Sequence, residues 1–152
     1  MTQDPTGLLR RMTRLHTVLQ QRTANACGLQ SLARCQILTL LEREGTLTLA
    51  EVSRQLGTDK AWMSRNIEAL VRNDLVHKQS QALDRRTVAL TLTEQGQAQA
   101  QALNGKLAHQ SARLLGRVPT DEQAGVLRAL ELLVEVLEAE TVAQEDATCS
   151  ST

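Results

Sequence analysis

Two charged segments in the middle of the chain carry side chains that could bind an anionic polymer. Lys60 and Arg65 lie close together with Trp62 and Ser64 between them, and an Asp-Arg-Arg run follows at residues 84–86. Lysine and arginine supply positive charge to phosphates, and an arginine guanidinium can also donate two hydrogen bonds to guanine O6 and N7. The residue types favour contact with a nucleic acid, and a solvated charged surface is the alternative.

The charge is unevenly distributed, although 17 basic and 17 acidic residues cancel over the whole chain. Residues 1–46 carry six basic and three acidic residues, residues 47–92 carry seven and five, and residues 93–152 carry four and nine. A basic front and an acidic back fit a protein that presents one face to an anionic polymer. They fit equally well a C-terminal helix with a solvated acidic face.

The other reactive side chains show no pattern that indicates a metal site, a cofactor site or an enzyme. The three cysteines and three histidines lack metal-ligand spacing, and no paired catalytic carboxylates, phosphate-binding glycine loop or nucleophile elbow occurs. The N-terminus does not resemble a signal peptide, and no apolar run approaches the roughly 20 residues of a membrane span. We expect no metal, no cofactor, no membrane contact and a location in the reducing cytoplasm.

The apolar residues before Gly45 follow the helical period and predict two helices. The first carries a stripe of leucine and methionine side chains and ends at or just before Gly28. The second could be capped by Ser31 and is stopped by Gly45.

A helix-turn-helix unit is predicted next. Thr48 and Glu51 have the spacing of a capping box, in which each side chain binds backbone N–H groups of the first helical turn. Gly57 stops this short helix, and another helix with a buried apolar stripe begins near Asp59. The stripe comprises Met63, Ile67 and Leu70, with Val71 beside it. Two such helices joined by a tight glycine-containing turn are typical of the helix-turn-helix motif.

The sequence period changes after Asn73-Asp74 from that of a helix to that of a strand. Val88, Leu90 and Leu92 alternate with small or polar residues, and residues 75–79 can supply a partner strand. The polar stretch between these strands, residues 80–86, would then form the charged tip of a hairpin, or wing.

Two further helices are predicted after the hairpin, over residues 94–116 and from Thr120 onward. The first of them is rich in Ala, Gln and Leu, which favour helix. Thr120 could cap the second, with Gln123 as its capping-box partner. The small and polar tail from about residue 143 is expected to be frayed.

These elements predict a mainly α protein with a small β-hairpin wing. The winged helix-turn-helix unit would occupy residues 31–93, between an N-terminal dimerisation helix at 1–30 and C-terminal dimerisation helices at 94–142, followed by a flexible tail at 143–152. The outer helices are too long and too apolar to stand alone beside so small a unit. Packing against a second copy would bury them, and closed two-fold dimers are the commonest solution.

One series of motifs between Leu29 and Gly96 is typical of a known family. The motifs are Ile37-Leu38, Leu41, Thr48-Leu49-Ala50-Glu51-Val52, Leu56-Gly57, Met63-Ser64-Arg65, Leu70, Leu75-Val76, Asp84-Arg85-Arg86, Val88 and Leu90-Thr91-Leu92-Thr93-Glu94-Gln95-Gly96. Through them the chain resembles the MarR family of winged helix-turn-helix transcriptional regulators. The resemblance implies a homodimer made by the N- and C-terminal helices that binds an inverted repeat and usually represses genes. It also implies that DNA affinity often falls when a small molecule binds or the protein is oxidised.

The resemblance implies a set of DNA-binding residues on the second helix of the motif. Ser64 and Arg65 lie where the family contacts DNA, and Lys60 and Trp62 lie beside them, off the buried stripe. Trp62 is the only aromatic residue, and we expect it to be partly exposed near the groove rather than in the core. Thr48 is a further candidate for a phosphate contact.

The wing residues Asp84, Arg85 and Arg86 complete the predicted interface. In the family pattern the aspartate pairs with an arginine to shape the wing, while an arginine enters the minor groove, where narrow A·T tracts concentrate negative potential. Arg86 is favoured for the ion pair and Arg85 for the groove, and a solvated charged turn is the alternative.

The signal that such a regulator would answer is open at the level of sequence. Cys27, near a helix end, is a candidate redox residue, whereas Cys35 in an apolar helix is expected to be a small buried residue. A small-molecule effector could instead bind between the dimer helices and the winged unit, as the resemblance implies.

Together these observations predict a regulator that is not an enzyme and whose partners are double-stranded DNA, a second copy of the chain and a small-molecule effector. A helical dimeric adaptor without DNA binding is the alternative. An adaptor has no need of the basic residues Lys60, Arg65, Arg85 and Arg86. Salt-sensitive DNA binding would separate the two classes.

Overall fold

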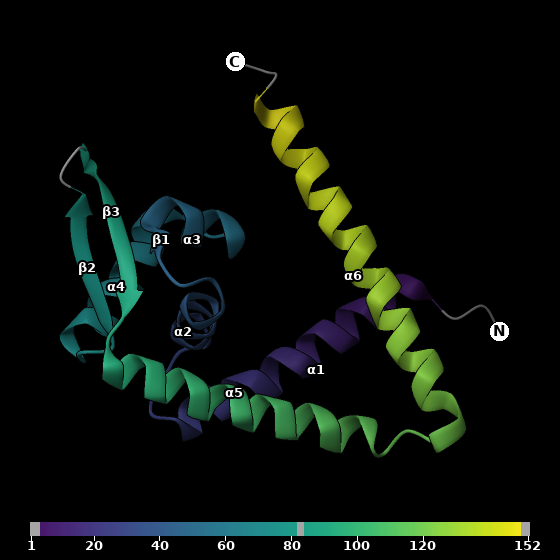
Figure 1. Cartoon of the computed structure of the whole chain (residues 1–152). Helices are drawn as coiled ribbons and strands as arrows, with labels where there is room; N and C mark the ends of the chain where they lie inside the picture. Colours follow the sequence, from purple (N-terminus) through teal and green to yellow (C-terminus); the bar gives the residue numbers. More distant parts are fainter. Residues whose placement is uncertain (1–3, 82–83, 150–152) are drawn as a thin grey trace. The chain divides into compact units, whose positions relative to one another are not determined.

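A computed structural model describes the backbone of residues 4–81 and 84–149 and the side chains of residues 4–80 and 87–143 (Figure 1). Its elements are α1 (Pro5–Ala26), α2 (Leu32–Glu44), β1 (Leu47–Thr48), α3 (Leu49–Gln55), α4 (Lys60–Arg72), β2 (Val76–Gln81), β3 (Asp84–Leu92), α5 (Glu94–Leu115) and α6 (Thr120–Cys149). The contacts divide the chain into two compact units, Met1–Ala108 and His109–Thr152. The predicted fold class, mainly α with a small β-hairpin wing, is confirmed.

The helix-turn-helix of the first unit forms as its local sequence predicts. The Thr48 hydroxyl accepts a hydrogen bond from the Glu51 backbone N–H at 3.2 Å, and the Glu51 carboxylate accepts one from the Thr48 backbone N–H at 2.7 Å. This capping box opens α3. Gly57 then turns the chain with a φ of 62°, a left-handed conformation that glycine adopts without steric cost. Asp59 caps the start of α4.

The sheet has one strand more than the predicted hairpin. Its order is β1-β3-β2, with both pairs antiparallel. The added strand β1 is only two residues long and pairs Leu47 with Leu90 and Thr48 with Ala89. Two residues are too few to show an alternating pattern, so the sequence could not indicate this strand. The hairpin strands also extend into the stretch predicted as a polar tip, as far as Gln81 in β2 and from Asp84 in β3.

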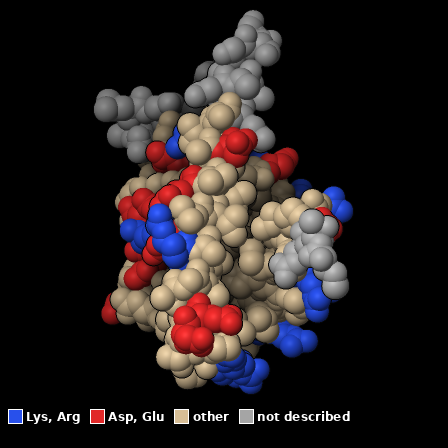
Figure 2. Space-filling view, turned by 90° about the vertical axis from the view of Figure 1, so that its right-hand side faces the viewer, with Lys and Arg blue, Asp and Glu red and all other residues tan. Residues whose placement is uncertain are grey.

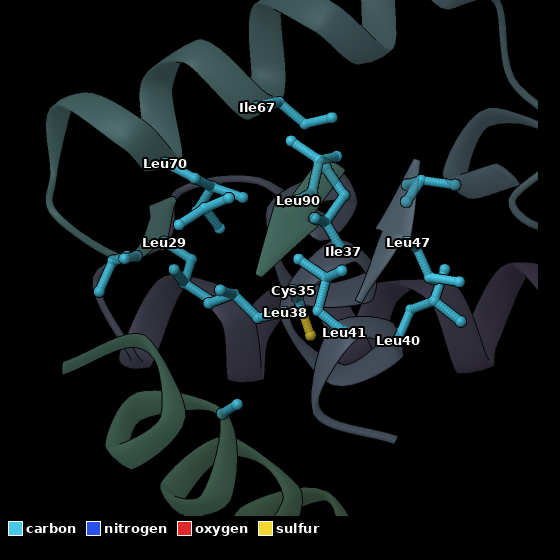
Figure 3. Close-up of a cluster of buried hydrophobic side chains, with 14 of the residues drawn as sticks. Leu29, Cys35, Ile37, Leu38, Leu40, Leu41, Leu47, Ile67, Leu70 and Leu90 are labelled. Carbon is cyan, nitrogen blue, oxygen red and sulfur yellow. The ribbon is translucent and has the colours of Figure 1, made fainter. Parts of the chain in front are cut away.

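The core of the first unit lies between α2, α4 and the sheet (Figure 3). Its fully buried large side chains are Ile37, Leu38 and Leu41 of α2, Val52 of α3, Met63, Ile67 and Leu70 of α4, Val76 and Leu90 of the sheet, and Leu103 of α5. The stripe predicted for α4 is therefore the buried face of that helix, with Val71 half-buried at its edge. Aliphatic and sulfur-containing side chains fill this core, since the chain has no Phe or Tyr and its one Trp is exposed.

The junction between the wing and α5 depends on Thr93 and Gly96. The buried Thr93 hydroxyl donates a hydrogen bond to the Asp74 carbonyl oxygen at 2.6 Å and accepts one from the Gly96 N–H at 2.8 Å. A Cβ at position 96 would overlap the carbonyl oxygen of Leu75. The Leu-Thr-x-x-Gly motif thus seats the first turn of α5 directly against the exit of α4.

The connection from α1 to α2 differs in one detail from the prediction. Gly28, with a φ of 75°, follows the end of α1 as expected. Ser31 occupies the position before α2, but its side chain makes no capping bond. Its hydroxyl lies 3.5 Å from Asn66 Oδ1 on α4, because α4 offers a tertiary acceptor at this point.

The second unit consists of the end of α5 and the long helix α6. The prediction that Thr120 caps this helix is wrong, because α6 begins at Thr120 itself. The Gln123 Nε2 donates to the Val118 carbonyl oxygen at 3.0 Å. The helix continues to Cys149, beyond the end expected near residue 142. The added segment contains Ala, Gln and Glu, which favour helix. Within residues 4–149, no helix combines the length and the apolar character needed to cross a bilayer.

Candidate nucleic-acid interface

The first turn of α4 is fixed by hydrogen bonds to one side chain that precedes it and one that follows it. The Asp59 carboxylate accepts hydrogen bonds from the N–H groups of Ala61 at 2.6 Å and Trp62 at 3.2 Å. The Asn66 side-chain amide donates to the Trp62 carbonyl oxygen at 3.0 Å. These bonds fix the backbone from which the predicted DNA-binding side chains project.

The predicted interface residues of α4 lie outside its buried stripe. Lys60 and Arg65 are exposed, and Ser64 is half-buried between the two sides. Trp62 is 41% exposed, so the expected partial exposure of its side chain is present. Within the described residues, neither Lys60 nor Arg65 is in an ion pair. Both cations are available for phosphates or base edges.

Thr48 has its hydroxyl group engaged within α3. The Oγ1 donates to Glu51 Oε2 at 2.9 Å while accepting the Glu51 backbone N–H. Hydrogen bonds from the Thr48 backbone and hydroxyl hold the pKa of Glu51 below its ordinary value, so Glu51 stays a charged acceptor. The Thr48 hydroxyl hydrogen is therefore already donated, and a phosphate would have to compete with Glu51 for it.

Strand β2 of the wing is joined to α4 by an ion pair that sequence reasoning missed. Lys78 Nζ on β2 lies 2.5 Å from Glu68 Oε1 on α4. The hydrogen bond and the charge of Lys78 lower the pKa of Glu68. Sequence reasoning interpreted Glu68 as a solvated or helix-pairing charge, because a partner on a strand gives no periodic signal. The side chains of Asp84, Arg85 and Arg86 lie outside the described residues.

The two described cysteines differ in burial. Cys35 is 3% exposed within the core, as expected. Burial, and next the neighbouring Cys27, raise the pKa of Cys35 to about 11, which leaves it a poor nucleophile. Cys27 is half-buried at the C-terminal cap of α1. In residues 4–80 and 87–143, no cluster of His, Cys, Asp and Glu is arranged to hold a metal ion.

The first unit also has a groove that could hold a small molecule. It has a volume of about 510 Å³ and lies between α2, α3 and α5. Its lining residues are Gln36, Thr39, Leu40, Glu42, Arg43, Gln55, Leu56, Asn104 and Leu107. Asn104 Nδ2 donates to Glu42 Oε2 at 2.9 Å within this lining. The groove thus combines aliphatic surface with amide, carboxylate and guanidinium groups.

The helix-turn-helix followed by a β-hairpin is the architecture of a winged helix-turn-helix protein. Residues 28–87 match the model of the MarR family. Over this segment the chain is therefore similar to the MarR family. Among curated protein sequences, none matches the chain.

Solved structures of MarR regulators share this fold over most of the chain. A MarR protein from Peptoclostridium difficile has a TM-score of 0.77 and 20% identity, covering 94% of this chain and 95% of its own. A MarR regulator from Methanosarcina mazei has a TM-score of 0.74 and 21% identity, covering 86% and 93%. BpsR from Bordetella bronchiseptica, whose DNA binding is regulated by 6-hydroxynicotinic acid, has a TM-score of 0.71 and 24% identity, covering 85% and 97%.

Proposed function

We propose that this chain is a homodimeric repressor that acts in the cytoplasm by binding an inverted-repeat operator in double-stranded DNA. The observation that carries the proposal is the first half of α4, where Met63 and Ile67 are buried in the core. Lys60 at the start of the helix and Arg65 on the side opposite Met63 and Ile67 are exposed, without ion-pair partners among the described residues. A recognition helix needs this division, because one side must be rigidly packed while the other enters the major groove.

The predicted contacts divide by chemistry. Arg65 can bind a guanine through two hydrogen bonds or a phosphate through its charge, and Lys60 suits a phosphate. Ser64 and Thr48 would add hydroxyl contacts to the backbone. For the wing, we keep the assignment of Arg85 to the minor groove and of Arg86 to an ion pair with Asp84.

Dimerisation is supported by apolar surface on the outer helices. Exposed residues of α1 include Leu8, Met12 and Leu15, at 52%, 47% and 47%. In α6, the exposed fractions of eight Leu and Val side chains range from 38% for Leu133 to 59% for Leu137 and Val142. Figure 2 shows a band of uncharged side chains running down α6, with acidic groups gathered along one side. Surface of this extent is expected to be covered by a partner.

The charges of these two helices favour pairing between copies. α1 carries four arginines and no acidic residue, whereas α6 carries eight acidic residues and one arginine. An α1 from one copy lying near α6 of another would set opposite charges beside a shared apolar contact. A second copy of this chain therefore fits the exposed surface in both polarity and charge.

Modulation by a small ligand is the regulatory part of the proposal. BpsR is regulated by 6-hydroxynicotinic acid, and PcaV from Streptomyces coelicolor was solved with its natural ligand. The groove between α2, α3 and α5 is the candidate site in this chain, because it touches the helix that leads into the recognition motif. Oxidation at Cys27 is the second mode of modulation that we propose, since the buried Cys35 has a raised pKa and is unsuited to react.

The test is recovery of the operator from genomic fragments with the purified protein, followed by titration of a labelled operator duplex. The recovered site should be an inverted repeat with half-sites about one helical turn, ~34 Å, apart. Arg65→Ala should weaken binding by at least tenfold, and by more if Arg65 grips a guanine, since a bidentate base contact contributes about 1–3 kcal/mol.

The matched control is Arg113→Ala, which removes the same charge from the exposed surface of α5. It should leave the affinity within about twofold of wild type, because a single distant charge is screened at physiological salt. Salt-insensitive binding, or equal losses for the two variants, would count against the proposed interface.

A further inference from the structure

Trp62 is an unusual residue to find on the surface of α4. It is the only aromatic residue in the chain, yet 41% of it is exposed, while smaller aliphatic side chains fill the core. Among the described residues, its indole N–H donates to no acceptor. A large apolar ring with a free donor is typical of the residues that dominate binding interfaces.

The position of Trp62 limits what its ring can meet. Asp59 and Asn66 bind its backbone N–H and C=O, so the ring projects from a fixed first turn of α4. Exposed Lys60 precedes it and exposed Arg65 follows within one turn, so that with the single carboxylate of Asp59 the nearby charges at the start of α4 sum to a net positive charge. This favours a polyanion over an apolar protein surface as the partner of the ring.

We propose that Trp62 recognises thymine, by laying its indole ring against a thymine C5-methyl group in the major groove. The inference rests on the proposed function, in which the start of α4 faces base edges. The thymine methyl is the apolar group that base pairs present in the major groove. An apolar ring placed there discriminates thymine from the other bases, and Lys60 and Arg65 hold the helix in register.

The first experiment replaces each thymine of the recovered operator with deoxyuridine, in both half-sites at once. This change removes only the C5-methyl group and leaves Watson–Crick pairing intact. We expect one thymine position in each half-site to be sensitive to this change. At that position the wild-type protein should lose about fourfold in affinity for each methyl group removed, because burial of one such group contributes about 0.8 kcal/mol.

Variants at position 62 then show whether Trp62 is the residue that contacts the thymine methyl group. Trp62→Ala should bind the thymine and deoxyuridine duplexes equally, whereas Trp62→Leu should keep part of the preference because it keeps apolar surface. Thermal unfolding of each variant verifies folding, which we expect to be unchanged because the ring is not in the core. A deoxyuridine penalty that persists in Trp62→Ala would overturn the proposal and point to another reader, such as the exposed Ala61.

The fluorescence of Trp62 separates this proposal from the one on which it rests. With no Tyr or other Trp in the chain, the protein emission comes from this ring. Operator binding, followed independently by anisotropy of a dye on the DNA, should change the emission and protect it from acrylamide quenching. Binding with unchanged emission and quenching would overturn the role of Trp62 and leave the regulator intact. A lack of DNA binding would overturn both.

Discussion

Gly96 is needed for contact rather than for backbone conformation. It lies within the first turn of α5, where a Cβ would overlap the Leu75 carbonyl oxygen and lie 2.8 Å from the Leu75 carbonyl carbon. The atoms in the way are backbone, and Leu75 is held by its own hydrogen bonds to Leu70 and Thr93. Neither partner can move aside as a flexible side chain would.

We therefore expect Gly96→Ala to destabilise the protein by at least about 1–3 kcal/mol, the range for overpacked sites. Urea unfolding followed by circular dichroism measures this. Gly105→Ala is the matched control in the same helix, where an added Cβ meets nothing within 4 Å. It should stabilise by about 0.5–1 kcal/mol, because alanine favours helix over glycine. Equal effects of the two substitutions would contradict the proposed close approach.

Local signals made several residues predictable. The period of 3.6 gives the buried stripe of α4, and the spacing of Thr48 and Glu51 gives the capping box. The bonds of Thr93 to Asp74 and Gly96 were not predicted, because one of them joins residues far apart in sequence. The same holds for the contact of Ser31 with Asn66. Sequence patterns report what a residue does within its own element, and long-range partners depend on how elements pack.

At the scale of elements, the pair of Glu68 and Lys78 links the recognition helix to the wing. Its two side chains are 46% and 37% exposed, so its contribution is small and screened. The direction in which this stabilising contribution changes with pH nevertheless follows from the lowered pKa of Glu68. The folded state lowers the pKa of Glu68, so the pair stabilises at pH values above the ordinary range of glutamate and loses this contribution as the pH falls through the lowered pKa.

A double-mutant cycle of Glu68→Gln and Lys78→Gln measures this coupling. At about pH 7 we expect a coupling free energy of about 0.2–1 kcal/mol, the range for exposed pairs. Below the ordinary glutamate pKa of ~4.3 it should shrink as the pH falls through the lowered pKa of Glu68, which a series of measurements down to about pH 2 would follow. Urea unfolding at each pH gives the free energies of the cycle. A coupling that grew on acidification would show that the two elements are joined by something else.

Most elements could be predicted, and the exceptions have physical reasons. Helices α1 to α4 and the hairpin have clear periodicity, glycine stops or caps, and α5 has a composition that favours helix. Strand β1 is two residues long and exists only because β3 offers it a partner. The far end of α6 was expected to fray because its residues are small and polar, yet their helix propensity carries the helix to Cys149.

At the scale of the whole molecule, the apolar surface of α6 predicts a monomeric variant. Leu133→Glu places a charge in the proposed contact between copies, where an unpaired buried carboxylate is strongly unfavourable. We expect sedimentation or light scattering to give about twice the chain mass of 16.7 kDa for wild type and a value near that mass for the variant. The Leu133→Glu variant should also bind the operator more weakly, since each monomer could hold only one half-site.

Glu131→Gln on the same helix is the control, because its side chain pairs only with the exposed Arg128 among the described residues. It should keep the wild-type mass. A wild-type protein that sediments as a monomer at all accessible concentrations would contradict the dimer, while leaving the recognition side of α4 unaffected.

The burial of Cys35 makes the first compact unit open to chemical measurement by itself. A thiol that is 3% exposed, with a pKa of about 11, reacts with a labelling reagent only when the surrounding core opens. In a chain whose other two cysteines are replaced by alanine, the labelling rate in native buffer would report the free energy of that opening. The labelling rate of Cys35 thus reports transient unfolding around α2, and ligands that bind the adjacent groove should lower this rate.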